Sequence, residues 1–273
     1  MRSLVQVQYR PLKKGREGHW FESSIAHMKL NVLFPPKFCK TKLRRVYENE
    51  DLLVIDKPAG LIVFPEEPIA EKTLIDILLE EFPSFKNVGH FPRYGIVHRL
   101  DKNTSGILVV AKNDKALNFF QKQFKEGEVV KKYSALVAGQ VNEDGGQVET
   151  LIGRSPQDRR KQKVYLSHQP GSKGKREAKT YYKALERFKD YTLLEVMPKT
   201  GRKHQIRAHL AYLHHPIAGD KLYGFKNQPT PPGLKRQFLH ARYLKIRLLD
   251  GEIKEFKSDL AEDLKKVLEN LKI

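Results

Sequence analysis

The sequence predicts an α+β fold with a mixed, largely antiparallel central sheet flanked by helices. Short apolar or alternating runs, which are typical of strands, outnumber the amphipathic segments that are typical of helices. The two kinds of segment do not alternate strictly, as the βαβ units of a parallel sheet require. Hydrophobic residues make up 40% of the 273 residues, which is enough to build a core.

The first elements are expected to be two extended segments and a short helix. Residues 52–55 form an apolar run typical of a strand, and Lys57-Pro58-Ala59-Gly60 is a turn signal. Residues 61–64 are predicted to be a second extended segment, which Pro65 ends. Thr73 can cap a helix that follows directly. The mostly buried residues of this helix are predicted to be Leu74, Ile75, Ile77, Leu78 and Leu79.

A buried strand, an amphipathic helix and a further strand are expected next. Residues 106–111 are continuously apolar, which predicts a strand covered on both faces. Asn113 can cap a helix and Gly127 can end it. The apolar face of this helix consists of Leu117, Phe120 and Phe124. Residues 131–139 then alternate as a strand does.

The second half is expected to contain three more strands and two helices. The segment from about 140 to 180 is rich in turns and basic residues, and the pattern predicts a loop there. The expected elements after it are strands at 178–185 and 191–197, a helix at 204–213 and a long strand at 238–249. Asp259 can cap a final helix. The apolar residues of that helix are Leu260, Leu264, Val267, Leu268 and Leu271.

The composition indicates a polyanionic partner. Lysine and arginine number 51 against 32 acidic residues, a formal net charge of +19. Such an excess favours nucleic acid over an anionic membrane surface. No apolar run approaches the roughly 18–20 residues that span a bilayer, and we expect no membrane partner. The single cysteine, Cys39, excludes an internal disulfide and a cysteine-based metal site. These features predict a cytoplasmic protein.

The chain is expected to consist of one catalytic domain behind a dissimilar N-terminal segment. Residues 1–27 carry five basic and two acidic residues without clean periodicity. We hypothesise that Met28 is the true start, because one permitted set of codons for Trp20-Phe21-Glu22-Ser23 matches the T-arm of a tRNA gene. Residues 28–43 would be a lead-in segment and residues 44–273 the domain.

The stretch IVHRLDKNTSGILVVAK, residues 96–112, places a single carboxylate, Asp101, in a polar turn between two apolar runs. His98-Arg99-Leu100-Asp101 is similar to the catalytic loop of protein kinases, but the extra Leu100 breaks that spacing, and no Asp-Phe-Gly occurs. Residues 171–176 lack the length and final Ser or Thr of a phosphate-binding P-loop. These two classes are therefore excluded.

A metal site is not predicted. His204 and His209 are five residues apart, which places them about 140° apart on a helix. Neither belongs to a His-Glu-x-x-His pair, and no carboxylate cluster accompanies them or the nearby His214 and His215. We expect these histidines to serve a turn, a packing contact or a phosphate contact.

Asp101 alone has two interpretations, an ordinary Asx-turn or a catalytic carboxylate. The surrounding blocks favour the second. The segment 96–112 resembles the signature of the RluA-type pseudouridine synthases, in which His-Arg-Leu-Asp is followed by Thr-Ser-Gly. Further blocks that resemble the family follow in order, and the resemblance extends from about residue 44 to 257. They are Lys131–Gly139, Lys161–Val164 with Ala178–Tyr181, Thr200–Leu210, His215–Gly224 and Leu239–Ala241.

The resemblance implies the pseudouridine synthase fold and the isomerisation of uridine to pseudouridine within RNA. This reaction calls for no cofactor and no metal. By resemblance, Asp101 is the essential carboxylate, as nucleophile or as base on the sugar, and Arg207 is the cation beside it. Burial alone would raise the pKa of a carboxylate, so a fixed cation is needed to keep it ionised. Without the family, Arg207 would be interpreted as a solvated helix charge.

The remaining site residues follow from the same resemblance. Tyr133 would lie against the target uracil, since a flipped base needs an aromatic contact; otherwise it is an ordinary sheet aromatic. Ile206 would supply apolar packing beside the pocket. Arg99, Lys102 and Arg202 flank the acid and could bind phosphates, or they could be simple surface charges.

RNA selection is expected to depend on the catalytic domain. Many relatives carry an N-terminal S4 RNA-binding module, and the residues before 44 do not resemble one. A tRNA or rRNA stem-loop is the expected substrate, because proteins usually recognise RNA sequence in single-stranded loops, and no obligatory protein partner is implied. The alternative is a non-catalytic RNA-binding protein on the same fold. Asp101, Tyr133 and Arg207 together favour the enzyme, since binding alone needs none of them.

Overall fold

The computed structural model describes residues 43–65 and 71–272. The segments 1–27 and 28–42, including Cys39 and the hypothetical start at Met28, lie outside this part of the chain. Residues Lys42–Ile273 cluster as one unit, and the proposed division into segments stays a prediction. The strands are β1 (Arg44–Glu48), β2 (Leu52–Lys57), β3 (Ser105–Ala111), β4 (Val130–Ala138), β5 (Gly145–Arg154), β6 (Gln162–Tyr165), β7 (Arg176–Arg187), β8 (Tyr191–Pro198), β9 (Leu239–Arg247) and β10 (Ile253–Lys257). The helices are α1 (Leu74–Glu81), the 3-10 helix η1 (Pro83–Asn87), α2 (Asp114–Glu126), α3 (Gln205–Tyr212) and α4 (Glu262–Leu271).

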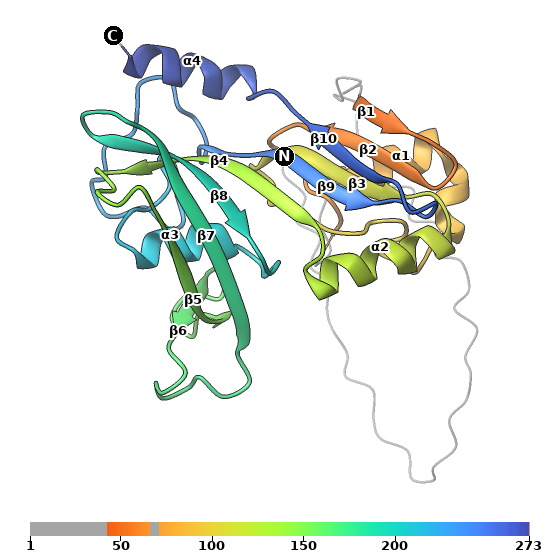
Figure 1. Ribbon diagram of the computed structural model, residues 1–273, viewed down its shortest axis with the longest axis horizontal. Coiled ribbons are helices and arrows are strands. Elements are labelled where there is room, and N and C mark those ends of the chain that lie inside the picture. The colour runs from red at the N-terminus through yellow and green to blue at the C-terminus, as the bar shows by residue number, and fades with distance from the viewer. Residues whose placement is uncertain (1–42, 66–70, 273) are drawn as a thin grey trace, which may run out of the picture. The chain divides into compact units, whose positions relative to one another are not determined.

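The ten strands form one sheet in the order β1-β2-β3-β9-β4-β8-β7-β5-β6, with β10 paired to β9. Every pairing is antiparallel except that of β3 with β9. Helix α2 contacts β3, while α3 contacts β6, β7 and β8 (Figure 1). The expected α+β fold with a mixed, largely antiparallel sheet is therefore confirmed.

The predicted helix boundaries at Thr73, Asn113 and Gly127 are confirmed. The Thr73 hydroxyl accepts the backbone N–H of Asp76, and the Asp76 carboxylate accepts the backbone N–H of Thr73, which makes a capping box. Asn113 accepts the N–H of Ala116 at the start of α2. Gly127 ends α2 in the left-handed conformation, with φ of 73°.

Two local expectations were wrong. Residues 61–64 form no strand; instead the carbonyls of Ile62 and Val63 accept the first N–H groups of α1, from Leu74 and Ile75. These bonds satisfy helix donors that would otherwise lack partners. Asp259 does not cap the last helix, because α4 begins at Glu262. Acidic side chains in its first turn complement the helix dipole instead.

The segment from 140 to 180 is more ordered than its composition indicates. It contains β5, β6 and the start of β7, which pair in one antiparallel array. On β5 only Val148, Thr150 and Ile152 are buried, and the residues between them are polar or partly exposed. Strands β1 and β10 were also missed, since each is only five residues long. Such short, half-polar strands give little hydrophobic signal.

Strand β9 brings two distant segments together. In the parallel pair, Gly106 of β3 lies opposite Ala241 of β9, and on the other side of β9 Tyr133 of β4 lies opposite the same residue. The register of β4 with β9 shifts between Lys132 and Tyr133, a bulge that re-aims the following side chains. The turn that carries Asp101 and the strand that carries Tyr133 therefore converge on one short piece of β9.

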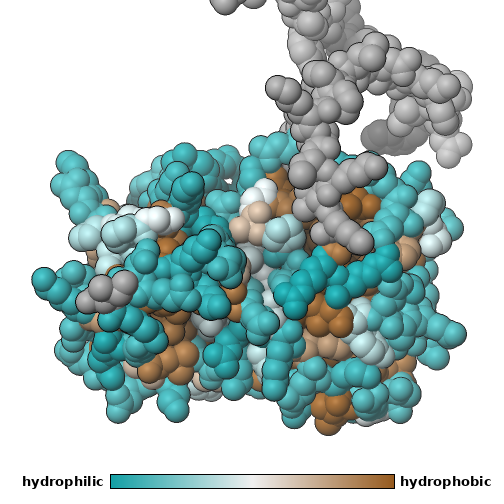
Figure 2. All heavy atoms as spheres, turned by 90° about the horizontal axis from the view of Figure 1, so that it is seen from above, coloured by the Kyte–Doolittle hydropathy of each residue, from teal (hydrophilic) through white to brown (hydrophobic). Residues whose placement is uncertain are grey.

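The surface is mostly hydrophilic on the face shown in Figure 2, with apolar side chains in small, separate patches. The exposed large apolar residues of the described chain include Phe91, Phe225 and Ile253, which lie in different segments. Within residues 43–65 and 71–272, no helix is both long and apolar enough to traverse a bilayer.

We expect Gly106→Ala to destabilise the fold strongly. Gly106 has φ of +115°, and a Cβ atom there would lie 2.3 Å from the carbonyl oxygen of Ala241. Strain and overpacking together should cost about 3 kcal/mol or more, which lowers the melting temperature by roughly 6–12 °C for a domain of this size. Thermal unfolding measures this.

The matched control is Gly60→Ala. Gly60 also has a positive φ, +86°, but nothing lies within 4 Å of a Cβ atom built there. Only backbone strain of about 1 kcal/mol is expected. Equal melting temperatures for the two variants would contradict the role assigned to the close approach of β3 and β9.

Candidate active site

Asp101 lies in a turn directly before β3. The turn is closed by the backbone N–H of Thr104, which donates to the carbonyl oxygen of Asp101 at 3.0 Å. The side chain of Asp101 does not take part in this bond. Its carboxylate instead accepts a hydrogen bond from Arg207, at 3.0 Å. The geometry therefore differs from the Asx-turn alternative.

Lys57 supports the turn from one side. Its ammonium group is fully buried and donates to the carbonyl oxygens of Pro58, Leu61 and Lys102, at 2.8, 2.9 and 3.1 Å. Each of the three N–H groups of the Lys57 ammonium thus donates to a separate carbonyl oxygen. Burial lowers the pKa of Lys57 to about 7, although the negative charge of Asp101 opposes that shift.

Arg236 and Gln237 support the turn from the other side. The guanidinium of Arg236 donates to the carbonyl oxygen of Asn103 and to the Ser105 hydroxyl, both at 3.1 Å. Gln237 donates to the Thr104 hydroxyl at 3.0 Å. Residues 102–105, which directly follow Asp101, are therefore held by buried side chains from β2 and from the segment before β9.

Arg207 connects two carboxylates. Its Nη1 donates to Oδ2 of Asp101, while its Nε and Nη2 donate to the two oxygens of Asp220 at 2.6 and 2.9 Å. Burial would lower the pKa of Arg207, but the hydrogen bond to Asp220 and the charges of both carboxylates outweigh this, and the pKa is raised. The guanidinium is therefore a permanent cation beside Asp101.

Asp220 is fixed more firmly than Asp101. Its side chain is fully buried, and its Oδ1 also accepts the backbone N–H groups of Leu222 and Tyr223, at 2.9 and 3.1 Å. Burial would raise the pKa of Asp220, yet the hydrogen bond and charge of Arg207 and these backbone donors lower it. Asp220 thus acts as the anchor of Arg207, and Asp101, which is partly exposed, is the carboxylate left for chemistry.

Tyr133 lies near the carboxylate in a buried position. Burial raises the pKa of its phenol, and the negative charge of Asp101 raises it further. The hydroxyl is therefore protonated at neutral pH. Ile206, which precedes Arg207 on α3, is buried in the same hydrophobic cluster as Tyr133. Asp101, Tyr133, Arg207 and Ile206 are thus brought together.

The three basic residues expected to meet phosphates make contacts with other parts of the protein. The guanidinium of Arg99 lies 5.0 Å from the centre of the Phe64 ring. Lys102 is exposed and pairs with Glu71 at 2.6 Å. Arg202 donates to the carbonyl oxygen of Glu177 at 2.8 Å. Their role in RNA binding stays a prediction.

Tyr223 was not singled out from the sequence, and His204 was expected only to serve a turn, a packing contact or a phosphate contact. Nε2 of His204 lies 3.9 Å from Oδ1 of Asp101. Its Nδ1 lies 3.1 Å from the hydroxyl of Tyr223, and the ring of Tyr223 lies under the guanidinium of Arg207, 4.9 Å away. Burial lowers the pKa of His204 and raises that of Tyr223 to about 12.

The other missed residues are Lys57, Asp220 and Arg236. The blocks Lys57–Gly60 and His215–Gly224 were noticed for their turn signal and resemblance, but no role was given to a residue within them. The signal that could have identified Asp220 is its Gly-Asp-Lys-Leu-Tyr context. An aspartate that follows glycine is typical of an Asx-turn, in which the carboxylate accepts backbone N–H groups two or three residues later in the chain.

His98 and His209 have structural roles. Nε2 of His98 accepts the N–H of Val109, and its ring stacks on Phe124 with centroids 4.4 Å apart. His209 lies between the hydroxyls of Thr150 and Thr180. Burial lowers the pKa of His98 to about 3 and that of His209 to about 4. Both rings are therefore neutral, as expected for the packing alternative.

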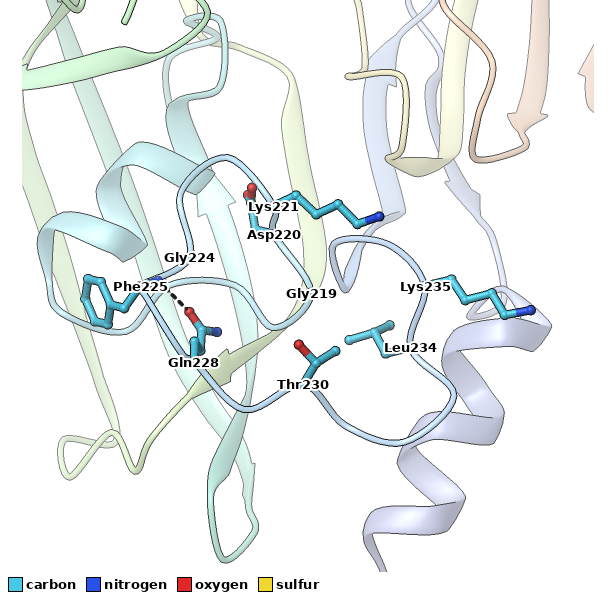
Figure 3. A pocket seen from close by; sticks show the side chains of 9 residues that line it. All are labelled: Gly219, Asp220, Lys221, Gly224, Phe225, Gln228, Thr230, Leu234 and Lys235. Atoms are coloured by element: carbon cyan, nitrogen blue, oxygen red, sulfur yellow. Dashed lines mark hydrogen bonds between the residues drawn. The ribbon is translucent and has the colours of Figure 1, made fainter. Parts of the chain in front are cut away.

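A pocket of about 610 Å³ lies on the loop 219–235, beside the anchor and not at Asp101 (Figure 3). The side chains of Lys221 and Lys235 extend in the same direction along it, while Gln228 accepts the backbone N–H of Phe225. Its lining residues are Gly219, Asp220, Lys221, Gly224, Phe225, Gln228, Thr230, Leu234 and Lys235. It borders the site through Asp220 alone.

Comparisons with known proteins agree with this geometry. Residues 51–212 match the family model of RNA pseudouridylate synthase. The chain is 40% identical to an RNA pseudouridine synthase of Aquifex aeolicus, over 82% of this chain and 69% of that protein. It is 36% identical to the ribosomal large subunit pseudouridine synthase D of Pasteurella multocida, over 84% of this chain and 71% of that protein.

A solved structure is also similar. Human RNA pseudouridylate synthase domain containing 4 is 26% identical, with a TM-score of 0.68, and the match covers 84% of this chain and 93% of that one. The chain therefore belongs to the RNA pseudouridylate synthase family and is an RluA-type RNA pseudouridine synthase, an isomerase that converts uridine to pseudouridine within RNA.

Proposed function

We propose that Asp101 is the catalytic carboxylate and that the substrate is a structured region of large-subunit ribosomal RNA. The observation that carries the first part is the bond between Asp101 and the buried, anchored Arg207. The second part rests on several relatives, from Pasteurella multocida and Nitrosomonas europaea among others, that are named as ribosomal large subunit pseudouridine synthases D. A tRNA is the second candidate.

The reaction breaks the N1–C1′ bond of uridine and forms a C5–C1′ bond. The proton on C5 is lost and N1 gains a proton, so the product is an isomer of the substrate. Asp101 would act on the sugar, either as nucleophile at C1′ or as base. Both roles require a carboxylate in a fixed position, and the hydrogen bond from Arg207 would hold it there.

Tyr133 would contact the uracil while it is detached from the sugar. Its ring is rigid because the residue sits on β4 between β8 and β9, next to the bulge. Base–aromatic contacts are worth about 1–3 kcal/mol. Because burial raises the pKa of its hydroxyl, Tyr133 would act in its neutral form.

RNA would also contact the basic segment between β5 and β7. The ammonium groups of Lys163 and Lys175 both lie 5.3 Å from the centre of the Tyr165 ring. Tyr165 is itself buried, so its ring would hold the two cations in place, and the ammonium groups would meet RNA phosphates.

We expect Asp101→Asn to abolish pseudouridine formation while RNA affinity stays nearly unchanged. The amide keeps the shape of the side chain but can neither attack nor take a proton. The measurement is mapping of carbodiimide-modified pseudouridines in total RNA from cells with the wild-type chain, with the variant or with neither. Turnover by the variant would remove Asp101 from its role, and a protein-dependent site only in tRNA would select the second substrate.

Asp220→Asn should lower kcat by about 10²-fold, because Arg207 loses its anchor and shifts relative to Asp101. Steady-state release of tritium from [5-³H]uridine-labelled large-subunit rRNA transcript measures kcat and KM separately. The matched control is Asp263→Asn, which removes a bidentate partner from Arg236. Asp263 is more exposed and does not hold Arg207, so a much smaller loss is expected. Equal losses would contradict the anchoring role.

The double variant Lys163→Ala and Lys175→Ala should weaken RNA binding in a salt-dependent way. For two lost phosphate contacts on single-stranded RNA, the slope of log K against log[salt] should become shallower by about 1.4. Binding of the same transcript at several salt concentrations measures this. Lys265→Ala with Lys266→Ala, on α4, makes the same change in net charge. If this control alters the slope equally, the segment between β5 and β7 has no special role.

A further inference from the structure

His204 adopts a backbone conformation that disfavours its own side chain. It lies at the N-terminus of α3 with φ of 54° and ψ of 19°, in the left-handed region, and its side chain makes no capping bond to the helix. Residues with a Cβ atom adopt this region rarely, although histidine does so more often than most of them, and glycine would adopt it more easily. The backbone alone does not require an imidazole here, so the contacts of the ring decide what it does.

The backbone around His204 is fixed by its neighbour Gln205. The amide oxygen of Gln205 accepts the Thr200 hydroxyl and the N–H of Arg202, at 2.8 and 2.9 Å. Its amide nitrogen donates to the carbonyl oxygen of Lys179 and to the Thr180 hydroxyl, at 3.0 and 2.9 Å. Four bonds to one buried side chain hold the start of α3, so the strained residue beside it has a defined position.

The hydrogen bonds of Tyr223 determine which nitrogen of His204 carries the proton. The backbone N–H of Gln162 donates to the Tyr223 oxygen at 2.6 Å, which fills one acceptor position of that oxygen and favours donation of the phenolic hydrogen to Nδ1 of His204, 3.1 Å away. A neutral imidazole whose Nδ1 accepts carries its hydrogen on Nε2. Burial lowers the pKa of His204, which agrees with the neutral form.

The N–H of His204 then faces the reactive side of Asp101. Oδ2 of Asp101 is occupied by Arg207, so Oδ1 is the oxygen available for the sugar. Nε2 of His204 lies 3.9 Å from Oδ1, which is too long for a hydrogen bond. Nε2 of His204 and Oδ1 of Asp101 therefore lie close together without a hydrogen bond between them.

We propose that His204 is a further catalytic residue, which donates its Nε2–H to a carbonyl oxygen of the target uracil while Asp101 acts on the attached sugar. The inference rests on the proposed role of Asp101. When the N1–C1′ bond breaks, its electron pair stays with the uracil, and the negative charge spreads from N1 to the carbonyl oxygens. O2 is the carbonyl next to N1, so it is the oxygen closest to a carboxylate that acts at the sugar. A preorganised neutral donor there stabilises the charge as it develops.

Two substitutions distinguish this role from a structural one. The amide nitrogen of glutamine can occupy nearly the place of Nε2, whereas that of asparagine corresponds to Nδ1. Asparagine, however, tolerates the left-handed backbone better. A donor role predicts that His204→Gln is the better enzyme, and a structural role predicts that His204→Asn is.

The test is single-turnover tritium release from [5-³H]uridine-labelled large-subunit rRNA transcript, together with RNA affinity and thermal unfolding. We expect His204→Asn to be slower by about 10²-fold, the usual effect of removing one such donor, and His204→Gln to stay within about tenfold of the wild type. RNA affinity should be unchanged in both. The proposal would be overturned if the asparagine variant reacted as fast as the wild type. It would also be overturned if the glutamine variant were no faster than the asparagine variant.

Two further variants complete the test. His204→Gly relieves the backbone strain and supplies no donor, so it should be as slow as His204→Asn and decides the question if the glutamine variant does not fold. A glycine variant as fast as the wild type would overturn the proposal. Asp101→Asn on the same transcript identifies a failure of another kind, because turnover by that variant would refute the proposed function itself.

Discussion

The contact on which the site depends is the bridge from Asp101 through Arg207 to Asp220. Three charges are removed from water here, and such burial is tolerated only when each charge is paired and hydrogen-bonded. Arg207 meets this requirement because its planar fork donates in two directions, with two N–H groups to Asp220 and one to Asp101. A lysine would offer the charge without this geometry. The bridge also makes the two carboxylates unequal, since the buried one is fixed by backbone N–H groups and the other keeps a free oxygen.

The rest of the fold brings the ends of this bridge together. Asp101 and Arg207 are 106 positions apart in the chain, so no local preference can join them. The parallel contact of β3 with β9 places the turn of Asp101, and pairing of β9 with β4 places Tyr133 beside it. Lys57 and Arg236 then bind the carbonyl groups of the two residues that follow Asp101, Lys102 and Asn103. This support explains how a turn can hold the carboxylate of Asp101 in a fixed position, although turns are usually the mobile parts of a protein.

The sequence alone predicted the parts of the fold that local chemistry determines. Thr73, Asn113 and Gly127 mark helix ends through their own side chains or backbone, so they could be recognised without tertiary information. Strand β5 could not be recognised in this way. Only part of it alternates between buried and exposed residues, and its partner strand β7 lies in a distant segment. At the site, Asp101 and Arg207 were found through ordered blocks that resemble a family. Asp220 was given no role and His204 only a turn, packing or phosphate contact, because the distances from their side chains to Arg207 and Asp101 are set by the tertiary structure.

The hydrogen bonds of Tyr223 join the basic outer part of the molecule to its reactive centre. Gln162 begins β6, the strand next to the basic loops, and its backbone N–H is bonded to the Tyr223 hydroxyl. The same hydroxyl meets His204, and the same ring lies against Arg207. A displacement of β6 would therefore reach both the donor and the cation beside Asp101 through one rigid side chain. A lysine of this region, Lys161, also lies 6.0 Å from the centre of that ring. If RNA contacts β6, as proposed above, that contact would be mechanically connected to the positions of His204 and Arg207, because a phenol ring transmits a shift of its hydroxyl without bending.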